Sequence, residues 1–184
     1  MKVHYFLYIL ILLNSCSNRP NWKELELENL KGNKIVLSEN EGPLVLFFLS
    51  PECPLCENYA LNMREHFEDA SLKSMAFYGI FPGEYYSKKQ ILKYKKVYDL
   101  KMEFLLDPDY SLTHSLSATV TPEVFLFNEK KELVYEGAID NWMMSLGKKR
   151  TVITEHYLKD AFKAMKNNRI PDTTKTTPIG CYIE

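Results

Sequence analysis

The most constraining feature of the sequence is a run of apolar residues that is followed at once by a helical pattern. Leu44–Leu49 (LVLFFL) is continuously apolar and lies between a Gly-Pro pair and a Ser-Pro pair. Such a run is typical of a strand buried on both faces of a sheet. After Pro54, apolar residues recur at helical spacing as far as about Leu72. The sequence therefore predicts a buried strand that leads directly into a helix.

The rest of the chain continues this alternation of strands and helices. Ser87 is a favourable residue for the N-cap of a helix rich in Lys and Tyr. We expect further strands at Lys34–Ser38, Met75–Phe81 and Glu103–Leu106, a hairpin of Val124–Phe127 and Glu132–Tyr135, and helices at Ser87–Leu100, Tyr110–Leu116 and Thr154–Met165. This order predicts an α/β fold in which a central mixed sheet is flanked by helices on both faces.

The first sixteen residues have the pattern of an export signal. One Lys precedes the apolar run Tyr5–Leu13, which is well short of the ~20 residues that a membrane-spanning helix needs. The segment ends in Leu-Asn-Ser-Cys16, which resembles the lipobox of bacterial lipoproteins, although Asn14 departs from it. We expect Cys16 to be acylated and to hold the chain at a membrane surface. The alternative is a plain signal peptide in which Cys16 is incidental, and in both cases the folded part works outside the cytoplasm.

These patterns divide the chain into four parts. Residues 1–15 are predicted to be a lipoprotein-type signal peptide, and residues 16–29 a tether for the lipid anchor. Residues 30–169 form one domain without internal repeats. Residues 170–184 contain Pro, Gly and several Thr without a hydrophobic period, and we expect them to form a flexible, loop-like tail that carries a cysteine.

Two cysteines lie at the junction of the buried strand and the helix. Cys53, at the helix start, faces unpaired backbone N–H groups and the positive end of the helix dipole, and both stabilise a thiolate. Cys56 is three residues further on, on the same helical face and close enough for a disulfide with Cys53. We expect Cys53 to attack a substrate disulfide and Cys56 to resolve the mixed disulfide.

The same pair admits two other interpretations, half of a zinc site or an inert structural disulfide. The chain has no second C-x-x-C and no H-x₃₋₅-H, so partners for zinc are lacking. The position at a strand-to-helix junction argues against an inert disulfide. A non-catalytic thiol module that binds a metal or a partner remains a third hypothesis.

Composition excludes other classes of function. Lys and Arg number 23 against 24 Asp and Glu, which gives a net charge of −1 and no basic excess for nucleic acid. The hydrophobic share of 46% and the charged share of 26% are those of an ordinary globular domain.

Two segments together resemble the thioredoxin-like superfamily: LVLFFLSPECPLC, which ends at Cys56, and VTPEVFLF, which contains Thr121-Pro122. Within it, the chain is similar to the exported redoxin branch of TlpA-type thiol–disulfide oxidoreductases and AhpC/TSA-like proteins, from about Leu30 to Lys166. The resemblance implies a thioredoxin-like fold and a cis Thr121-Pro122 bond whose loop packs against the redox pair. The backbone of Thr121 would then be an edge with which a bound thiol substrate can pair. The alternative is an ordinary proline at the start of a strand.

The sequence also departs from the family patterns. Glu52 precedes Cys53 where thioredoxin has the Trp of W-C-G-P-C. Cys-Pro-Leu-Cys is nearer to the Cys-Pro-x-Cys of oxidising periplasmic relatives, but Leu55 is not the His that stabilises their thiolate, so strong oxidising power is not implied. The peroxiredoxin signature P-x-x-x-[TS]-x-x-C is half present, since Ser50 fits it and Leu46 occupies the proline position. Peroxide reduction by Cys53 is therefore the second hypothesis.

Three further side chains are candidates for the site. Glu52 and Glu123 are the carboxylates nearest the pair, and Glu123 is our candidate for a proton shuttle from Cys56, with a solvated loop glutamate as the alternative for each. Cys181 follows Gly180 in the tail and resembles a Gly-Cys tail of some redoxin-branch proteins. It is either an extra resolving thiol or a free surface cysteine.

The sequence thus predicts a thiol–disulfide oxidoreductase of the cell envelope, lipid-anchored and facing the periplasm. It implies no metal and no organic cofactor. The expected partners are protein or small thiol and disulfide substrates, a membrane or periplasmic electron donor, and the membrane surface through lipidated Cys16. Nucleic acid is not expected.

Overall fold

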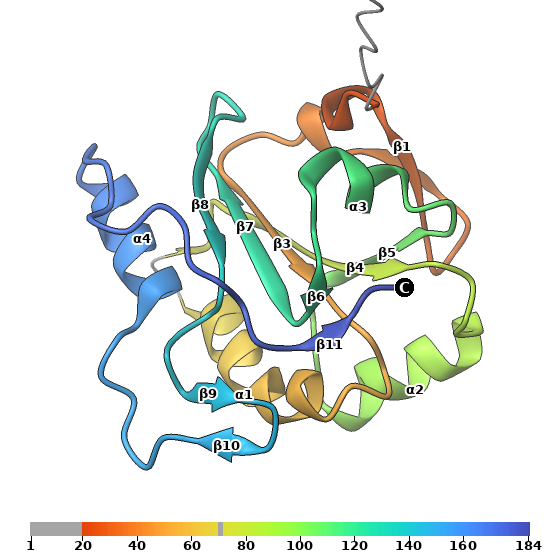
Figure 1. The fold of residues 1–184 in the computed structure, drawn as a ribbon. Coiled ribbons are helices and arrows are strands. Elements are labelled where there is room, and N and C mark those ends of the chain that lie inside the picture. Colours follow the sequence, from red (N-terminus) through yellow and green to blue (C-terminus); the bar gives the residue numbers. More distant parts are fainter. Residues whose placement is uncertain (1–19, 70–71) are drawn as a thin grey trace, which may run out of the picture.

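A computed structural model describes residues 20–69 and 72–184, and its centre is a seven-stranded sheet (Figure 1). The strands are β1 Glu26–Asn29, β2 Lys34–Val36, β3 Leu44–Phe48, β4 Ala76–Pro82, β5 Glu103–Asp107, β7 Glu123–Phe127 and β8 Leu133–Gly137. Their order in the sheet is β2-β1-β5-β4-β3-β7-β8. The β3, β4 and β5 strands are parallel, whereas β7, β8, β1 and β2 join antiparallel, so the prediction of a mixed sheet is confirmed.

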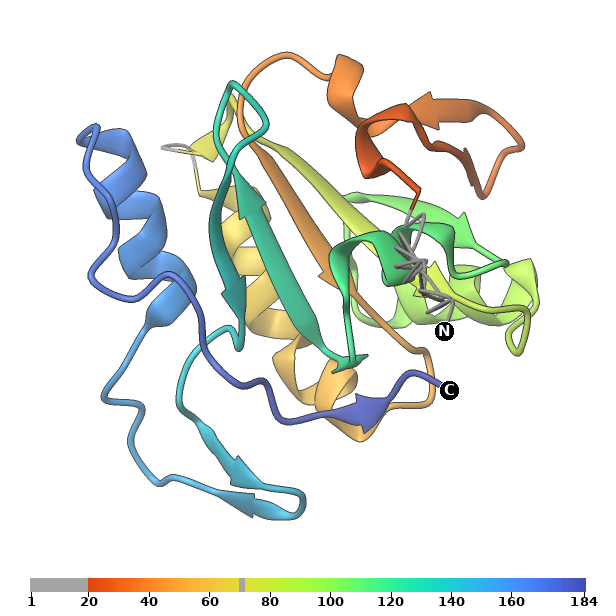
Figure 2. The ribbon, with the colours of Figure 1, turned by 45° about the horizontal axis from the view of Figure 1, so that its top comes forward.

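Helices cover both faces of the sheet, as predicted (Figures 1 and 2). All five residues of β3 are buried. On one face, Val45 and Phe47 pack in a single core with α1 Pro54–Glu68, α2 Lys88–Val97 and α4 Tyr157–Lys166. On the other face, Leu44, Leu46 and Phe48 pack with α3 Ser111–Leu116 and with residues of the 3₁₀ turns η1 Trp22–Glu24 and η2 Leu37–Glu39. The strand that precedes the two cysteines is therefore fixed from both sides.

Local sequence signals explain where the two central helices begin. Pro54 occupies the first turn of α1, where its missing N–H costs no hydrogen bond. Ser87 caps α2, because its side chain accepts from the Gln90 N–H while the Gln90 side chain accepts from the Ser87 N–H. The predicted N-cap at Ser87 is confirmed.

The predicted tether reaches too far into the chain. Residues 26–29 form β1, which pairs with β2 and β5, so the domain begins before residue 30. Leu27 and Asn29 are buried, and the Asn29 side chain accepts from the N–H groups of Lys31 and Asn33 to close the turn into β2. Trp22 stacks on Phe127 with ring centroids 4.4 Å apart. With only four residues and two glutamates, β1 is too short and too polar to show a clear alternation in sequence.

The C-terminal tail follows a defined path across the molecule instead of hanging free. Figures 1 and 2 show it passing along β8 and then reaching β6 Val120–Thr121, with which its last strand, β11 Cys181–Tyr182, pairs antiparallel. The prediction of a flexible, loop-like tail is corrected by these pairings. A two-residue strand held mainly through backbone groups leaves no periodic signal in the sequence.

A second small hairpin also lacks a sequence signal. Strands β9 Met143–Ser145 and β10 Lys148–Lys149 are mostly exposed and pair with each other outside the main sheet. The predicted export signal and Cys16 lie outside the described residues. Within residues 20–69 and 72–184, no helix is both long and apolar enough to cross a membrane.

Candidate active site

Cys53 lies at the point where the chain leaves the central sheet and enters α1. It is the N-cap residue of that helix, with extended backbone angles (φ −80°, ψ 114°), and Pro54 follows in the first turn. The Cys53 N–H donates to the Ser50 carbonyl oxygen at 3.2 Å, which closes a tight turn after β3. Its side chain makes no capping hydrogen bond. The sulfur therefore lies at the positive end of α1, as predicted from the sequence.

Cys56 lies one turn further along α1 and is completely buried. Its sulfur accepts from the Ser50 N–H at 3.5 Å, and it hydrogen bonds with the Cys53 sulfur. The Cys56 carbonyl oxygen accepts from the Tyr94 hydroxyl of α2 at 3.0 Å. The two thiols are therefore neighbours, both free, with Cys56 held beneath Cys53 by contacts from two elements.

The Thr121-Pro122 bond is cis, as the family resemblance implied, and its loop packs against Cys53. The Cys53 thiol donates to the Thr121 carbonyl oxygen at 3.0 Å across a sequence separation of 68 residues. Thr121 belongs to β6, which is not part of the main sheet and pairs with β11. The structure thus brings the predicted docking loop to the predicted nucleophile.

Cys181 adds a third sulfur to the site. Its Sγ lies 2.6 Å from the Cys53 Sγ, and the two residues are 128 positions apart in the sequence. Cys181 is partly exposed, whereas Cys53 is only 1% exposed. The sequence identified Cys181 as a leftover thiol, but nothing in it placed this residue against Cys53.

The three thiols have very different acidities. The pKa of Cys53 is lowered to about 4, first because the Cys56 thiol donates a hydrogen bond to it. The Cys181 thiol and the Cys56 backbone N–H lower this pKa further, whereas burial opposes the shift. Burial raises the pKa of Cys56 well above its usual range, and the neighbouring Cys53 raises it further. Burial and the neighbouring Cys53 raise the pKa of Cys181 to about 12. At neutral pH the negative charge therefore resides on Cys53, and the other two thiols are its hydrogen-bond donors. The hydrogen bond from Cys53 to the Thr121 carbonyl oxygen belongs to the protonated form of Cys53.

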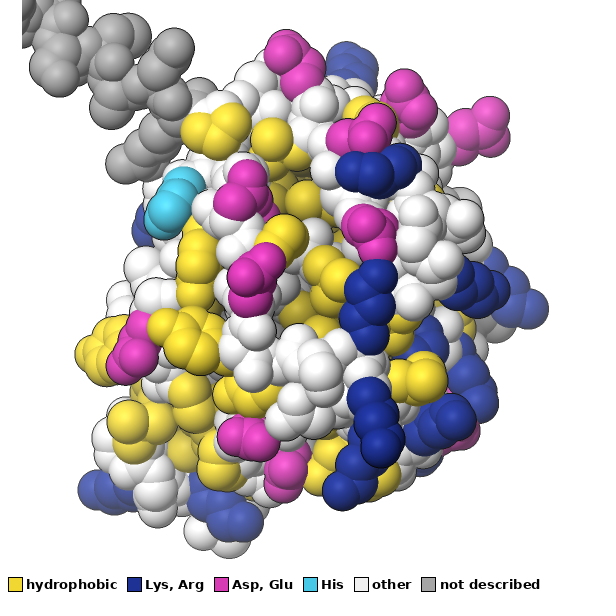
Figure 3. All heavy atoms as spheres, turned by 90° about the vertical axis from the view of Figure 1, so that its right-hand side faces the viewer, with side chains coloured by type: hydrophobic (Ala, Val, Ile, Leu, Met, Phe, Trp, Pro, Cys, Tyr) yellow, Lys and Arg dark blue, Asp and Glu magenta, His cyan; other side chains and the backbone are white. Residues whose placement is uncertain are grey.

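A cleft of about 410 Å³ opens beside Cys53 and Cys181. Four tyrosines line it together with Cys53 and Cys181; the lining comprises Leu49, Ser50, Glu52, Cys53, Pro82, Tyr85, Tyr86, Gln90, Tyr110, Thr121, Cys181, Tyr182, Ile183 and Glu184. The Ser50 hydroxyl donates to the Tyr86 hydroxyl at 3.0 Å. Figure 3 views the molecule from the side of α2 and the C-terminus in Figure 1, where exposed hydrophobic side chains lie between acidic and basic ones. None of these tyrosines was predicted as a site residue, although the density of tyrosines between residues 85 and 110 was a signal for three of them.

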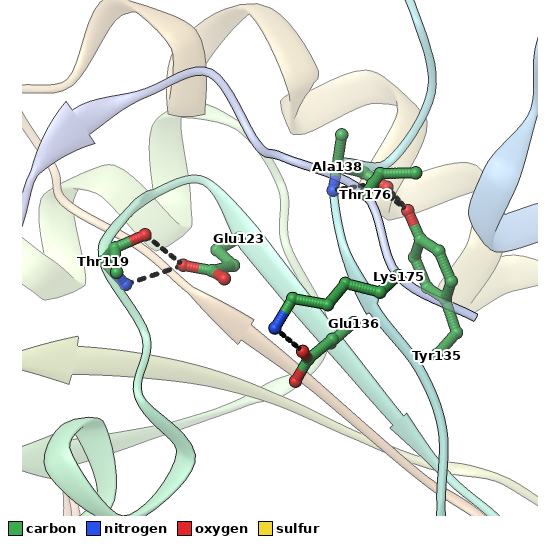
Figure 4. A network of polar contacts seen from close by, with 7 residues as sticks. All are labelled: Thr119, Glu123, Tyr135, Glu136, Ala138, Lys175 and Thr176. Atoms are coloured by element: carbon green, nitrogen blue, oxygen red, sulfur yellow. Dashed lines mark hydrogen bonds and ion pairs between the residues drawn. The ribbon is translucent and has the colours of Figure 1, made fainter. Parts of the chain in front are cut away.

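The two predicted carboxylates occupy different positions. Glu52 is exposed and lines the cleft. Glu123 is buried in β7, and its Oε2 accepts from the N–H groups of Thr119 at 2.7 Å and Val120 at 3.3 Å and from the Thr119 hydroxyl at 3.3 Å (Figure 4). Burial raises the pKa of Glu123, and these hydrogen bonds oppose the rise. The Glu123 carboxylate thus binds the two residues that precede Thr121. Transfer of a proton from Cys56 to Glu123 stays a prediction.

His66 packs away from the three cysteines, and the hypothesis of a metal site finds no support in the described residues. His66 lies on α1 and makes an edge-to-face contact with Phe162 of α4, with ring centroids 5.4 Å apart. Among residues 20–69 and 72–184, no group of three or more His, Cys, Asp or Glu side chains is arranged to hold a metal ion.

Comparison with known proteins identifies the family. Residues 20–136 match the model of the AhpC/TSA family, which is more than half of the chain. The chain belongs to the AhpC/TSA family. Its predicted membership of the thioredoxin-like redoxins is therefore confirmed. Among curated proteins, none matches the chain in sequence.

Several solved structures share the fold. A hypothetical protein from Sinorhizobium meliloti 1021 is 24% identical with a TM-score of 0.75, over 86% of this chain and 89% of that one. An uncharacterized conserved protein from Geobacillus kaustophilus is 20% identical with a TM-score of 0.76, over 87% of each chain. A secreted disulfide oxidoreductase of Mycobacterium tuberculosis is 18% identical with a TM-score of 0.54, over 61% of this chain and 81% of that one. The thioredoxin-like fold predicted from the sequence is confirmed.

Proposed function

We propose that this AhpC/TSA-family protein is a thiol–disulfide oxidoreductase in which Cys53 is the attacking thiol and Cys56 the resolving thiol. One observation carries the proposal: Cys53 lies at the N-terminus of α1, 3.0 Å from the Thr121 carbonyl oxygen, and the neighbouring Cys56 is the largest cause that lowers its pKa to about 4. A thiolate at neutral pH beside a second thiol is what a disulfide-exchange enzyme requires.

The reaction consumes two thiols and one substrate disulfide. The Cys53 thiolate attacks one sulfur of the substrate disulfide, forms a mixed disulfide and releases the other sulfur as a thiolate. Cys56 then loses its proton and attacks the Cys53 sulfur, so that a Cys53–Cys56 disulfide forms and the second substrate sulfur leaves as a thiolate. Two electrons pass from the cysteine pair to the substrate. The reverse sequence oxidises a substrate dithiol.

The buried state of Cys56 sets the order of these steps. Its raised pKa keeps it protonated at neutral pH, so it does not compete with Cys53 for the incoming disulfide. Once Cys53 is part of a mixed disulfide, its negative charge is gone. The charge on Cys53 is one of the causes that raise the Cys56 pKa, so its loss makes Cys56 easier to ionise.

The docking loop supplies a place for a polypeptide substrate. The Thr121 carbonyl oxygen contacts the Cys53 sulfur, and the Thr121 backbone belongs to a two-residue ladder outside the main sheet. An extended peptide that adds to this edge would bring a sulfur to Cys53 through backbone hydrogen bonds, with little demand on its sequence. The cleft of tyrosines beside it offers apolar surface with polar tips, which suits unfolded or loop segments.

We also propose that the protein works in the cell envelope, anchored through lipidated Cys16 and facing the periplasm. The predicted export signal supports this location, and the structurally similar protein of Mycobacterium tuberculosis is described as secreted. Electrons would then come from a membrane or periplasmic donor. Labelling of Cys16 with a radioactive fatty acid in bacteria, compared with Cys16→Ser, tests the anchor, and equal labelling of the two would exclude it.

Reduction of insulin disulfides tests the activity. The reference protein is the full chain carrying Cys16→Ser, which removes only a thiol outside the described residues. With a chemical dithiol as reductant, we expect Cys53→Ser to abolish turnover. A variant with both Cys56→Ser and Cys181→Ser should trap a mixed disulfide with insulin through Cys53, because neither neighbouring thiol is left to resolve it. Turnover that is unaffected in Cys53→Ser would exclude the proposal.

Peroxide reduction is the second candidate, favoured by the match to the AhpC/TSA family model. In that reaction the Cys53 thiolate attacks a peroxide oxygen and becomes a sulfenic acid, which a second cysteine converts to a disulfide with loss of water. Consumption of hydrogen peroxide that survives Cys56→Ser but not Cys53→Ser, together with no insulin reduction, would favour this activity over the first.

A further inference from the structure

The C-terminal strand occupies the edge that a substrate would use. In the antiparallel pairing of β11 with β6, Cys181 lies opposite Thr121 and Tyr182 opposite Val120. The Ile183 N–H extends this ladder by donating to the Thr119 carbonyl oxygen at 3.0 Å. An extended peptide docked on Thr121 would need these same backbone positions. The chain has therefore placed one of its own segments at its proposed docking site.

This segment brings a thiol to the attacking sulfur. The Cys181 Sγ lies 2.6 Å from the Cys53 Sγ, which is the place that a substrate sulfur must reach. Cys53 is only 1% exposed with the segment in position. A bulky external disulfide and Cys181 therefore cannot occupy the site together.

The tail is held along its course by contacts that would let it cover and uncover Cys53 reversibly. We call residues 174–183 the C-terminal strap. The Thr176 hydroxyl hydrogen bonds with the Tyr135 hydroxyl at 2.6 Å and accepts from the Ala138 N–H at 2.9 Å, and Lys175 forms an exposed ion pair with Glu136 (Figure 4). The Glu136 N–H donates to the Thr174 carbonyl oxygen, and the Thr176 N–H to the Glu136 carbonyl oxygen, each at 3.0 Å. The anchor on β8 positions the strap, while only a short ladder holds Cys181 itself.

Gly180 shows how closely the strap fits. A Cβ atom at this position would overlap the carbonyl oxygen of Thr121. Only glycine lets the strap approach β6 closely enough for Cys181 to reach Cys53. The side chain of the next residue but one, Tyr182, is in contrast 80% exposed.

We propose that Cys181 is a third redox thiol, carried by a strap that occupies the substrate-docking edge and is displaced when an extended cysteine-containing polypeptide binds. The inference rests on the proposed oxidoreductase function and adds to it the substrate class and the closing step. The strap acts as a tethered substrate: it binds where the polypeptide binds, and the two occupy the edge in turn.

The closing step is a thiol–disulfide exchange that needs no further oxidant. After turnover, Cys53 and Cys56 share a disulfide and the edge is empty. Cys181 loses its proton and attacks the Cys53 sulfur; the Cys53–Cys181 bond forms, the Cys53–Cys56 bond breaks, and Cys56 leaves as a thiolate that takes up a proton. The disulfide thereby moves from the fully buried Cys56 to the partly exposed Cys181, where an external dithiol can reduce it.

Disulfide mapping tests the third thiol. The full chain with Cys16→Ser is equilibrated in glutathione buffers, quenched in acid, alkylated and analysed by peptide mass spectrometry. We expect an intramolecular Cys53–Cys181 disulfide in addition to Cys53–Cys56, and the Cys53–Cys181 disulfide alone in Cys56→Ser. Absence of any Cys53–Cys181 disulfide in Cys56→Ser, or Cys181 found only in bonds between molecules, would overturn the proposal.

Accessibility of Cys53 tests the strap without relying on that disulfide. In a background with Cys16→Ser, Cys56→Ser and Cys181→Ser, Cys53 is the single remaining thiol, and its alkylation by a bulky maleimide is timed. Gly180→Ala, or a chain that ends at Ile179, should raise the rate by about tenfold or more, because the strap must leave β6. Thr177→Ala is the matched control and should leave the rate unchanged, since that strap residue is exposed and does not line the cleft. Equal rates in all four proteins would contradict a strap that covers Cys53.

The insulin assay separates failure of this inference from failure of the proposed function. If Cys53→Ser and Cys56→Ser lose turnover while Cys53–Cys181 never forms and Gly180→Ala does not expose Cys53, the oxidoreductase stands and the strap proposal falls. If Cys53→Ser keeps full turnover, the oxidoreductase falls, whatever the mapping shows.

Discussion

Cys181 lies directly opposite Thr121 in the ladder between β11 and β6, and the carbonyl oxygen of Thr121 lies 3.0 Å from the Cys53 sulfur. One residue of the docking loop therefore aligns the attacking thiol with the tail thiol. The acidities of the three cysteines follow from this arrangement, because two protonated thiols converge on one thiolate.

We predict that the pKa of Cys53 rises in both Cys56→Ala and Cys181→Ala, and rises more in Cys56→Ala. Each variant removes a hydrogen-bond donor to the thiolate, and the bond from Cys56 is the largest cause of the lowered pKa. The measurement is the pH dependence of Cys53 alkylation by iodoacetamide, with the reacted cysteine identified by mass spectrometry. In the reference protein the rate should stay level above about pH 6, because Cys53 is already a thiolate there.

Glu52→Gln is the control for this titration. Glu52 lines the cleft but is exposed, so its loss should leave the Cys53 profile in place. A Cys53 profile in the reference protein that rises through pH 8–9, as for a free cysteine, would contradict the thiolate assignment.

We predict that Thr176→Val loosens the strap, whereas Lys175→Ala has little effect. Valine has nearly the same shape as threonine but lacks the hydroxyl that bonds Tyr135 and Ala138, and the loss of such bonds costs about 1–3 kcal/mol. Each 1.4 kcal/mol raises the open fraction tenfold. The Lys175 side chain is 77% exposed, so its ion pair with Glu136 is screened by water.

Hydrogen exchange of the Ile183 amide, which donates to the Thr119 carbonyl oxygen, is followed by mass spectrometry and measures this opening. Faster exchange in Thr176→Val than in Lys175→Ala is the expected order. The reverse order would mean that the ion pair, and not the buried hydroxyl, holds the strap.

The central βα unit was predictable from the sequence because its signals are local and strong. A fully apolar strand, a Pro in the first helical turn and two cysteines three positions apart specify the Cys53 site almost alone. Ser87 likewise indicates the start of α2, because it forms a capping box with Gln90. The position of Thr121-Pro122 against Cys53 was inferred from family resemblance, since no local pattern links residues 68 positions apart.

The strap and the first strand could not be predicted for a common physical reason. Both are held by backbone hydrogen bonds to an edge, which impose no hydrophobic period on their side chains. The signal that remained was Gly180 beside Cys181, where close backbone contact excludes any side chain. A glycine next to a lone thiol in an otherwise polar tail is a weak hint, and its meaning depends on the distant strand β6.

We predict that His66 makes the stability of the protein fall in weak acid. Burial lowers the pKa of His66 from an ordinary 6.5 to about 4, so the unfolded chain binds a proton there that the folded chain does not. The stability that neutral His66 allows is complete above about pH 6.5 and is lost progressively as the pH falls towards 4. Thermal unfolding between pH 7 and 4.5 should therefore show a smaller fall in Tm for His66→Gln than for the reference protein.

His114→Gln is the comparison for this experiment, since His114 lies on α3, on the other face of the sheet. The two substitutions remove the same titratable group type from different surroundings. Equal effects of both on the pH dependence of Tm would contradict the role assigned to the burial of His66.

We predict that Glu123 acts as a positioning residue for the loop before Thr121, and that Glu123→Gln keeps insulin reduction while Glu123→Ala loses most of it. Glutamine retains an oxygen that accepts from the Thr119 and Val120 N–H groups. Alanine leaves both donors without this partner, and the buried Val120 N–H then costs about 1–3 kcal/mol. The KM for insulin should rise more than kcat falls in Glu123→Ala, because the docking edge and not the thiol chemistry is disturbed.

The pH dependence of the same variants separates positioning from proton transfer. Because burial raises the pKa of Glu123 above its unfolded value, its carboxyl favours the folded state below the ordinary glutamate pKa, and this contribution is lost as the pH rises through the folded pKa. Glu123→Gln lacks that titration, so its stability relative to the reference protein should increase over the same rise in pH. If Glu123 instead shuttles the proton of Cys56, Glu123→Gln would lower kcat and remove a limb of the kcat–pH profile, and the Cys53 alkylation rate would not change. A kcat for Glu123→Gln within about twofold of the reference, with an unaltered profile, supports positioning, because only a proton carrier needs an ionisable group at this position.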